Sequence, residues 1–177
     1  MNQVKKIVFI TGGARSGKSQ FALEMARNFP GVRAYLATAQ ALDEEMGDRI
    51  RRHRESRGKD WQTLEEPLDI AGVLARVGNQ FGLILLDCLT LWLSNAMMAG
   101  WPEEKVLTET DRFLRAARDA ESSILIVSNE VGLGIVPENA DARTFRDWSG
   151  WIHQKMAREA DEVYFLLCGI AQKIKGN

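Results

Sequence analysis

The sequence contains few of the residues that build disulfide frameworks and metal sites. Its 177 residues include two cysteines, two histidines and four prolines. Cys88 and Cys168 both lie in apolar stretches, and neither belongs to a cysteine–histidine spacing that would bind a metal ion. We therefore expect both to be reduced, buried thiols, as is usual in a cytoplasmic protein, with a reactive cysteine as the alternative.

A strong net charge and a long uninterrupted apolar run are also missing. The net charge is −1, so no global basic field is present to recruit nucleic acid, and any anion binding must be local. Residues 1–6 are short and polar, and the longest apolar stretch, residues 81–101, is interrupted by Asp87 and by turn-forming residues. Neither has the form of a signal peptide or a membrane span. We expect a cytoplasmic protein without stable membrane insertion.

Short apolar runs alternate along the chain with longer segments of helical spacing. This alternation predicts an α/β fold, with a mainly parallel sheet and helices on both faces. The length suits one compact domain, and because no repeat or Pro/Ser-rich linker divides the chain, we expect residues 1–177 to form a single domain. Strands are predicted over 6–11, 32–38, 83–87, 123–128 and 162–168, and helices over 19–28, 42–57, 68–77, 103–120 and 142–160, with a further helix following Asp87.

A glycine-rich loop directly follows the first predicted strand. Residues 12–19, GGARSGKS, match the pattern G-x-x-x-x-G-K-[ST], whose backbone N–H groups surround a phosphate at the start of a helix. Lys18 would reach the β- and γ-phosphates, and Ser19 would bind Mg²⁺. A chance glycine-rich turn is the alternative, but the strand before the loop and the amphipathic segment after it favour nucleotide binding. The loop residues predicted to contact the nucleotide are Gly12, Gly13, Ala14, Arg15, Ser16, Gly17, Lys18 and Ser19.

Two more predicted strands end in polar residues at the sheet edge where α/β proteins bind ligands. Asp87 ends the third strand and is a candidate Mg²⁺ ligand, or alternatively a cap of the helix that follows. Asn129 and Glu130 follow the fourth strand, and Glu130 is a candidate for substrate positioning or proton acceptance, with a polar turn as the alternative. The guanine-reading motif of Ras-like switches is missing, which weakens that class of function.

The stretch RIRRHRESR, residues 49–57, places His53 among five arginines. His53 shares a helical stripe with Met46 and Ile50, while acidic residues precede the arginines and match the helix dipole. A stable surface helix with an incidental histidine explains this pattern. A neutral imidazole that attacks phosphorus, with arginines that neutralise the phosphate oxygens as pyrophosphate leaves, explains it as well. Spacing alone leaves both readings open.

Four stretches together resemble one known family. They are ITGGARSGKS, ATAQALDEEMGDRIRRHRESR, SNEVGLGIVPEN and FRDWSGWIHQKMAREADEVYFLLCGI. In this order they resemble the bifunctional adenosylcobinamide kinase / adenosylcobinamide-phosphate guanylyltransferase family over nearly the whole chain. The resemblance implies a RecA-like P-loop fold, a homotrimer, and two reactions in the assembly of the cobalamin nucleotide loop. ATP or GTP, with Mg²⁺, phosphorylates adenosylcobinamide, and GTP then donates GMP to that phosphate.

The same resemblance implies roles for individual residues. His53 matches the histidine that carries the GMP group, and the acidic residue that ends the third strand matches Asp87, where family members can have Glu. His153 stands where they can have Asn, and we expect it on a helix surface rather than in catalysis. A P-loop kinase of another small metabolite and a non-catalytic nucleotide-binding module are the alternative functions. Beyond the phosphate loop, the implied nucleotide contacts are Ala37, Thr38, Ala39, Arg54, Glu55, Ser56, Arg57, Glu65 and Asp87.

Overall fold

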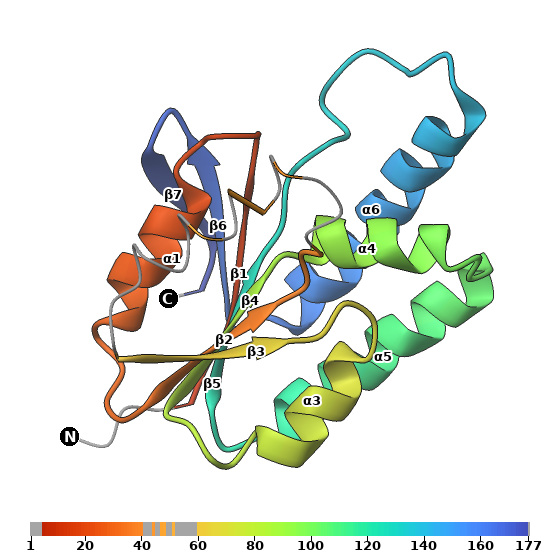
Figure 1. The fold of residues 1–177 in the computed structure, drawn as a ribbon. Helices are drawn as coiled ribbons and strands as arrows, with labels where there is room; N and C mark the ends of the chain where they lie inside the picture. The colour runs from red at the N-terminus through yellow and green to blue at the C-terminus, as the bar shows by residue number, and fades with distance from the viewer. Residues whose placement is uncertain (1–4, 41–43, 45–46, 49–50, 52–59, 177) are drawn as a thin grey trace.

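A seven-stranded sheet is the centre of the fold in the computed structural model, which describes residues 5–40, 44, 47–48, 51 and 60–176 (Figure 1). The predicted alternation of strands and helices is confirmed over this part of the chain. In chain order the elements are β1 (Ile7–Gly12), α1 (Lys18–Ala26), β2 (Arg33–Ala37), β3 (Trp61–Glu65), α3 (Ile70–Val77), β4 (Leu83–Asp87), α4 (Leu89–Met98), α5 (Glu103–Asp119), β5 (Ser123–Val127), α6 (Ala140–Glu159), β6 (Glu162–Leu167) and β7 (Ile170–Lys175).

The strands lie in the order β3-β2-β4-β5-β1-β6-β7. All neighbouring pairs from β3 to β6 are parallel, and only β7 runs antiparallel, against β6. The predicted mainly parallel sheet is therefore confirmed. Because the parallel strands run in one direction, the segments that follow β1, β2, β3, β4 and β5 all leave the sheet at the same edge. We call this the carboxyl edge.

Helices cover both faces of the sheet, as predicted. One face packs against α3, α4, α5 and α6, and its core includes Phe9, Trp92 and Phe113, each at most 1% exposed. The other face packs against α1, whose Ala22 and Ala26 contact alternate residues of the same central strands. Since β1, β4 and β5 are buried on both faces, their sequences are continuous apolar runs. Among the helices of the described part of the chain, none is long and apolar enough to span a membrane.

Two strands were not predicted, and both lie at an edge of the sheet. β3 has no fully buried residue, so its sequence WQTLE lacks the apolar run that marks the central strands. β7 is exposed along most of its length and follows β6 through a two-residue turn. Both residues of that turn, Cys168 and Gly169, have positive φ angles, as a tight hairpin requires. The expected buried position of Cys168 is therefore wrong, because its side chain is exposed at the tip of the hairpin.

Candidate active site

The loop between β1 and α1 is held in its conformation by close backbone contacts with β6 and the hairpin. A Cβ on Gly12, whose φ is +149°, would lie 2.3 Å from the carbonyl oxygen of Leu166. Gly17 has a φ of +96°, and the N–H of Gly169 donates to the carbonyl of Ser16 over 3.0 Å. These two glycines are required because a side chain has neither the space nor the backbone freedom at their positions.

Lys18 is the first residue of α1, and its side chain lies within the loop. The residue is 6% exposed, and its Nζ donates to the carbonyl oxygen of Gly13 over 2.5 Å and to Ser16 Oγ over 3.4 Å. The ammonium group is thus held among the loop atoms that the motif predicts to surround a phosphate. Of the other loop residues, Gly13, Ala14 and Arg15 are exposed.

Ser19 and Asp87, which the sequence names separately as candidate Mg²⁺ ligands, meet at the carboxyl edge. Ser19 Oγ donates to Asp87 Oδ2 over 3.0 Å, and the hydroxyl of Tyr35 donates to the same oxygen over 2.7 Å. Tyr35 was not predicted, since within β2 it reads only as a buried strand residue. The alternative in which Asp87 caps the next helix is wrong, because Cys88 is the N-cap residue of α4 and no side chain caps that helix.

The donor set at this position is suitable for magnesium. A serine hydroxyl and a carboxylate are the oxygen ligands that Mg²⁺ uses in nucleotide sites, where phosphates and water complete the shell. No cluster of three or more His, Cys, Asp or Glu side chains that could hold a metal ion occurs within the described ranges. A magnesium ion that binds together with nucleotide phosphates needs only one or two protein ligands, so the pair Ser19 and Asp87 is sufficient.

The predicted contacts after β2 and β3 lie at the same level of the sheet. Ala37 pairs with Asp87 on one side and with Glu65 on the other. Glu65 is exposed, whereas Thr38 is fully buried and exchanges hydrogen bonds with the backbone of Cys88. The Thr38 side chain therefore joins β2 to β4, while the exposed Glu65 carboxylate is open to a ligand.

Asn95 of α4 connects the segment that follows β2 to the segment that follows β3. Its Nδ2 donates to the carbonyl of Thr38 over 2.8 Å and to the carbonyl of Pro67 over 3.1 Å. One buried amide thus sets the spacing between the segment after β2 and the segment after β3. The sequence offers no signal for this role, because nothing in the pattern distinguishes Asn95 from Thr90 and Ser94, the other polar residues of α4.

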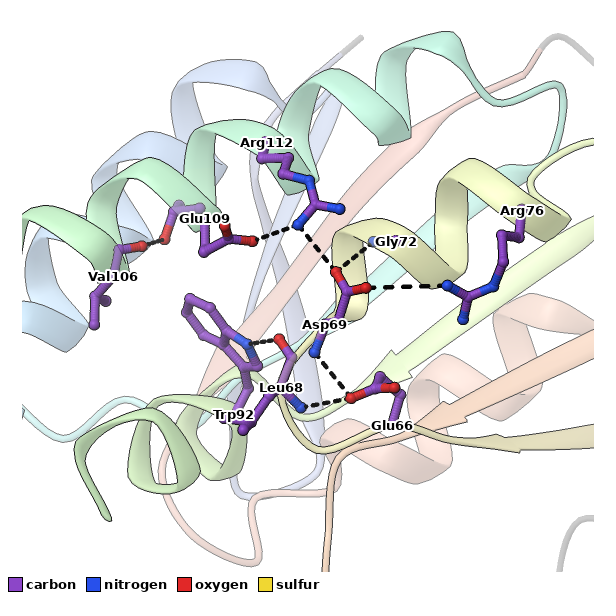
Figure 2. A network of polar contacts seen from close by, with 10 residues as sticks. Glu66, Leu68, Asp69, Gly72, Arg76, Trp92, Val106, Glu109 and Arg112 are labelled. Carbon is purple, nitrogen blue, oxygen red and sulfur yellow. Dashed lines mark hydrogen bonds and ion pairs between the residues drawn. The ribbon is translucent and has the colours of Figure 1, made fainter. Parts of the chain in front are cut away.

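The segment after β3 is also braced from the side of α3 and α5 (Figure 2). Glu66 Oε1 accepts the N–H groups of Leu68 and Asp69, and the indole of Trp92 donates to the carbonyl of Leu68. Asp69 caps α3 and forms an ion pair of 3.0 Å with Arg112 of α5. These contacts fix the path of the chain immediately beyond Glu65.

Glu130 lies beside the phosphate loop and faces a histidine. Its N–H donates to the carbonyl of Gly12 over 2.9 Å, and its Oε2 lies 3.7 Å from Nδ1 of His153. His153 Nε2 shares a hydrogen bond of 2.7 Å with Ser128 Oγ, and its ring packs against Phe9. The expected helix-surface position of His153 is therefore wrong, because its side chain is only 12% exposed and lies between α6 and the sheet.

Burial and charge set the protonation of two groups near this edge. Burial lowers the pKa of His153 from its usual 6.5, and the facing Glu130 carboxylate opposes part of that shift. Burial, together with the charge of Asp87, raises the pKa of Cys88 to about 11. Cys88 is thus a buried thiol that stays protonated near neutral pH, as the sequence predicts, and it lacks the thiolate character of a reactive cysteine.

Five predicted site residues lie outside the described ranges. These are His53, Arg54, Glu55, Ser56 and Arg57. The same holds for most of the helix predicted over 42–57. The structure does bring Gly12–Ser19, Ala37, Glu65, Asp87 and Glu130 to one edge of the sheet, where Asp87 contacts the start of α1 through Ser19.

Comparisons with known proteins agree with the resemblance seen in the sequence. Residues 8–174 match the model of the family described as cobinamide kinase / cobinamide phosphate guanyltransferase. The chain is 41% identical to the bifunctional adenosylcobalamin biosynthesis protein CobP of Pseudomonas aeruginosa, covering 94% of this chain and 96% of the relative. It is 36% identical to the bifunctional adenosylcobalamin biosynthesis protein CobU of Salmonella typhimurium, covering 96% of this chain and 99% of the relative.

Solved structures of distant sequence share the fold. The RadB recombinase superposes with a TM-score of 0.51 at 14% identity, over 90% of this chain and 73% of that protein. A prototypical ATPase of a bacterial type III secretion system superposes with a TM-score of 0.55 at 14% identity, over 95% of this chain and 56% of that protein. At this identity the likeness concerns the fold alone, and it confirms the predicted P-loop α/β architecture.

Proposed function

The chain belongs to the cobinamide kinase / cobinamide phosphate guanyltransferase family, and we propose that it performs both of these reactions in cobalamin biosynthesis. It phosphorylates adenosylcobinamide with a nucleoside triphosphate and then transfers GMP from GTP to that phosphate. The product is adenosylcobinamide-GDP. The observation that carries the proposal is the phosphate loop with its Ser19–Asp87 pair at the carboxyl edge, inside a family match that spans residues 8–174.

In the kinase step, the hydroxyl oxygen of adenosylcobinamide forms a bond to the γ-phosphorus of the triphosphate. The bond between that phosphorus and the β-phosphate oxygen breaks, and a nucleoside diphosphate leaves. Lys18 and the loop N–H groups hold the phosphates, and Ser19 with Asp87 would hold Mg²⁺, which neutralises phosphate charge when bound. Glu130 would receive the hydroxyl proton, since the hydrogen bond from its backbone N–H to the Gly12 carbonyl holds this residue beside the phosphate loop.

In the guanylyl step, a ring nitrogen of His53 forms a bond to the α-phosphorus of GTP and pyrophosphate leaves. A phosphate oxygen of adenosylcobinamide phosphate then attacks the same phosphorus, which releases His53 and completes the product. Arg54 and Arg57 would neutralise the phosphate oxygens. Glu55, Ser56 and the exposed Glu65 would complete the nucleotide contacts beyond Ala37–Ala39.

The decisive experiment labels the protein with α-³²P GTP in the absence of adenosylcobinamide and then denatures it. We expect a label that is labile in acid and stable in alkali, as a phosphoramidate is, and that disappears in His53→Ala. Arg51→Ala is the matched control, because Arg51 is exposed and pairs with Asp48; it should retain the label. A label that persists in His53→Ala contradicts the assignment of His53.

A second assay follows γ-³²P ATP or GTP into adenosylcobinamide. Transfer of the γ-phosphate to the corrinoid without a guanylylated protein would support a kinase that lacks the second activity. The absence of both transfers would support a non-catalytic nucleotide-binding module.

The homotrimer and the cytoplasmic location are also part of the proposal. Sedimentation equilibrium tests the homotrimer that the resemblance implies, and cell fractionation tests the cytoplasmic location.

A further inference from the structure

The connection between β5 and α6 carries three exposed apolar side chains, two of which are the most exposed large apolar side chains in the described part of the chain. Leu133 is 82% exposed, Ile135 96% and Val136 59%. Figure 1 shows this connection as a wide loop that rises from the same edge of the sheet as the phosphate loop. We call these three residues the apolar tip. Single exposed apolar residues are ordinary, but three within four consecutive residues of one loop mark an interaction site.

Both ends of the loop are fixed by hydrogen bonds, whereas none between described residues holds the tip. At the first end, the N–H of Glu130 donates to Gly12, and Glu130 Oε1 accepts the N–H of Gly132 over 2.5 Å. At the other end, Arg143 of α6 donates to the carbonyl oxygens of Pro137 and Glu138 over 2.9 and 2.6 Å. These hydrogen bonds fix the backbone at both ends of the loop, and the apolar tip lies between the two fixed ends.

The first end of the loop lies beside the phosphate loop, because the N–H of Glu130 donates to the carbonyl oxygen of Gly12. The nucleotide is polar and highly charged, and the groups of the phosphate loop would bind its phosphates. The second substrate must bring a hydroxyl to that phosphate while the rest of a large macrocycle lies outside the loop. A macrocycle with apolar faces and methyl groups is the substrate that would gain from burying Leu133, Ile135 and Val136.

We propose that the apolar tip binds the corrin macrocycle of adenosylcobinamide and thereby delivers its hydroxyl to the phosphate loop. This inference rests on the proposed function and adds to it the surface that recognises the acceptor. The exposed tip offers the apolar surface, and the Glu130–Gly12 hydrogen bond places its loop beside the phosphate loop. The occupant is the corrinoid rather than the nucleotide or a second copy of the chain.

The test compares Leu133→Ser and Ile135→Ser with the wild-type protein in the kinase assay. We expect the KM for adenosylcobinamide to rise by about tenfold in each, because removal of one buried aliphatic side chain costs at least that much affinity. The KM for the triphosphate and the extent of self-guanylylation with GTP alone should stay unchanged. Those two readouts report the fold and the nucleotide site without the corrinoid.

A matched pair of valines controls for the loss of exposed apolar surface. Val136 and Val32 are both 59% exposed, but Val32 precedes β2 at the opposite edge of the sheet. Val136→Ser should raise the KM for adenosylcobinamide, and Val32→Ser should not.

Three outcomes would overturn the inference. One is an unchanged KM in the tip variants; another is an equal rise in Val32→Ser. The third is a rise that accompanies dissociation of an oligomer and is reversed at high protein concentration, which would assign the tip to a contact between copies. Failure of the wild-type protein to phosphorylate adenosylcobinamide at all would refute the proposed function instead.

Discussion

Replacement of Asn95 by alanine should destabilise the protein and loosen the nucleotide site together. Asn95 is 9% exposed, and its amide is the donor to the carbonyl oxygens of Thr38 and Pro67. Asn95→Ala leaves both oxygens without this donor in a largely buried place. Each such oxygen costs about 1–3 kcal/mol, so we expect a loss of about 2–6 kcal/mol in the free energy of unfolding.

For a chain of this length, 1 kcal/mol shifts the melting temperature by about 2–4 °C, so Asn95→Ala should melt roughly 4–24 °C lower. Differential scanning calorimetry and urea denaturation measure this change. The KM for GTP should also rise, because Asn95 sets the distance between the segments that follow Ala37 and Glu65, two of the predicted nucleotide contacts. Asn28→Ala, at an exposed asparagine, is the control and should melt like the wild type.

A second substitution separates the hydrogen bonds from the volume of the side chain. Asn95→Leu fills the space but supplies no donor, so it should be about as destabilising as Asn95→Ala. If Asn95→Leu regains wild-type stability, or if Asn95→Ala costs less than about 1 kcal/mol, the reasoning from the two carbonyl oxygens is refuted.

Three further substitutions test single contacts of the site. Since burial lowers the pKa of His153, the stability that this residue contributes is complete above 6.5 and is lost as the pH falls through its folded-state pKa; His153→Asn should remove that dependence in urea titrations at pH values on both sides of 6.5. Tyr35→Phe removes the hydroxyl that donates to Asp87, and the Mg²⁺ concentration for half-maximal kinase activity should rise about tenfold; an unchanged Mg²⁺ dependence would contradict this role. Gly12→Ala places a Cβ 2.3 Å from a carbonyl oxygen of β6 and should cost more than about 2 kcal/mol of stability, whereas Gly13→Ala, with no atom within 4 Å, should be nearly neutral.

The central strands were predictable because burial on both faces leaves a direct trace in the sequence. β1, β4 and β5 are continuous runs of apolar residues, and their boundaries agree with the structure within one residue. The sequences of β3 and β7 contain no such apolar run, since each is an edge strand that is paired on one side and has no fully buried residue. Their positions follow from hydrogen bonds with neighbours that are distant in the sequence or lie across a turn.

Within the candidate site, too, some residues were predictable from the local sequence and others depend on the tertiary structure. Its glycines, Lys18 and Ser19 follow from local geometry, because one short segment supplies all the groups that surround a phosphate. Asp87 was predictable from its place at the end of a buried strand. Tyr35, by contrast, meets Asp87 only because β2 and β4 are neighbours in the sheet.

The sequence by itself therefore determined the P-loop α/β fold and, through ordered motifs, the family, and it predicted the candidate nucleotide site. Only the tertiary structure decided the surroundings of the residues that come from distant elements. His153 is the clearest case: helical periodicity left it on a surface, but the packing of α6 against the sheet buries it between Phe9, Ser128 and Glu130. A local pattern records which residues repeat along one helix, whereas burial depends on which element packs against that face.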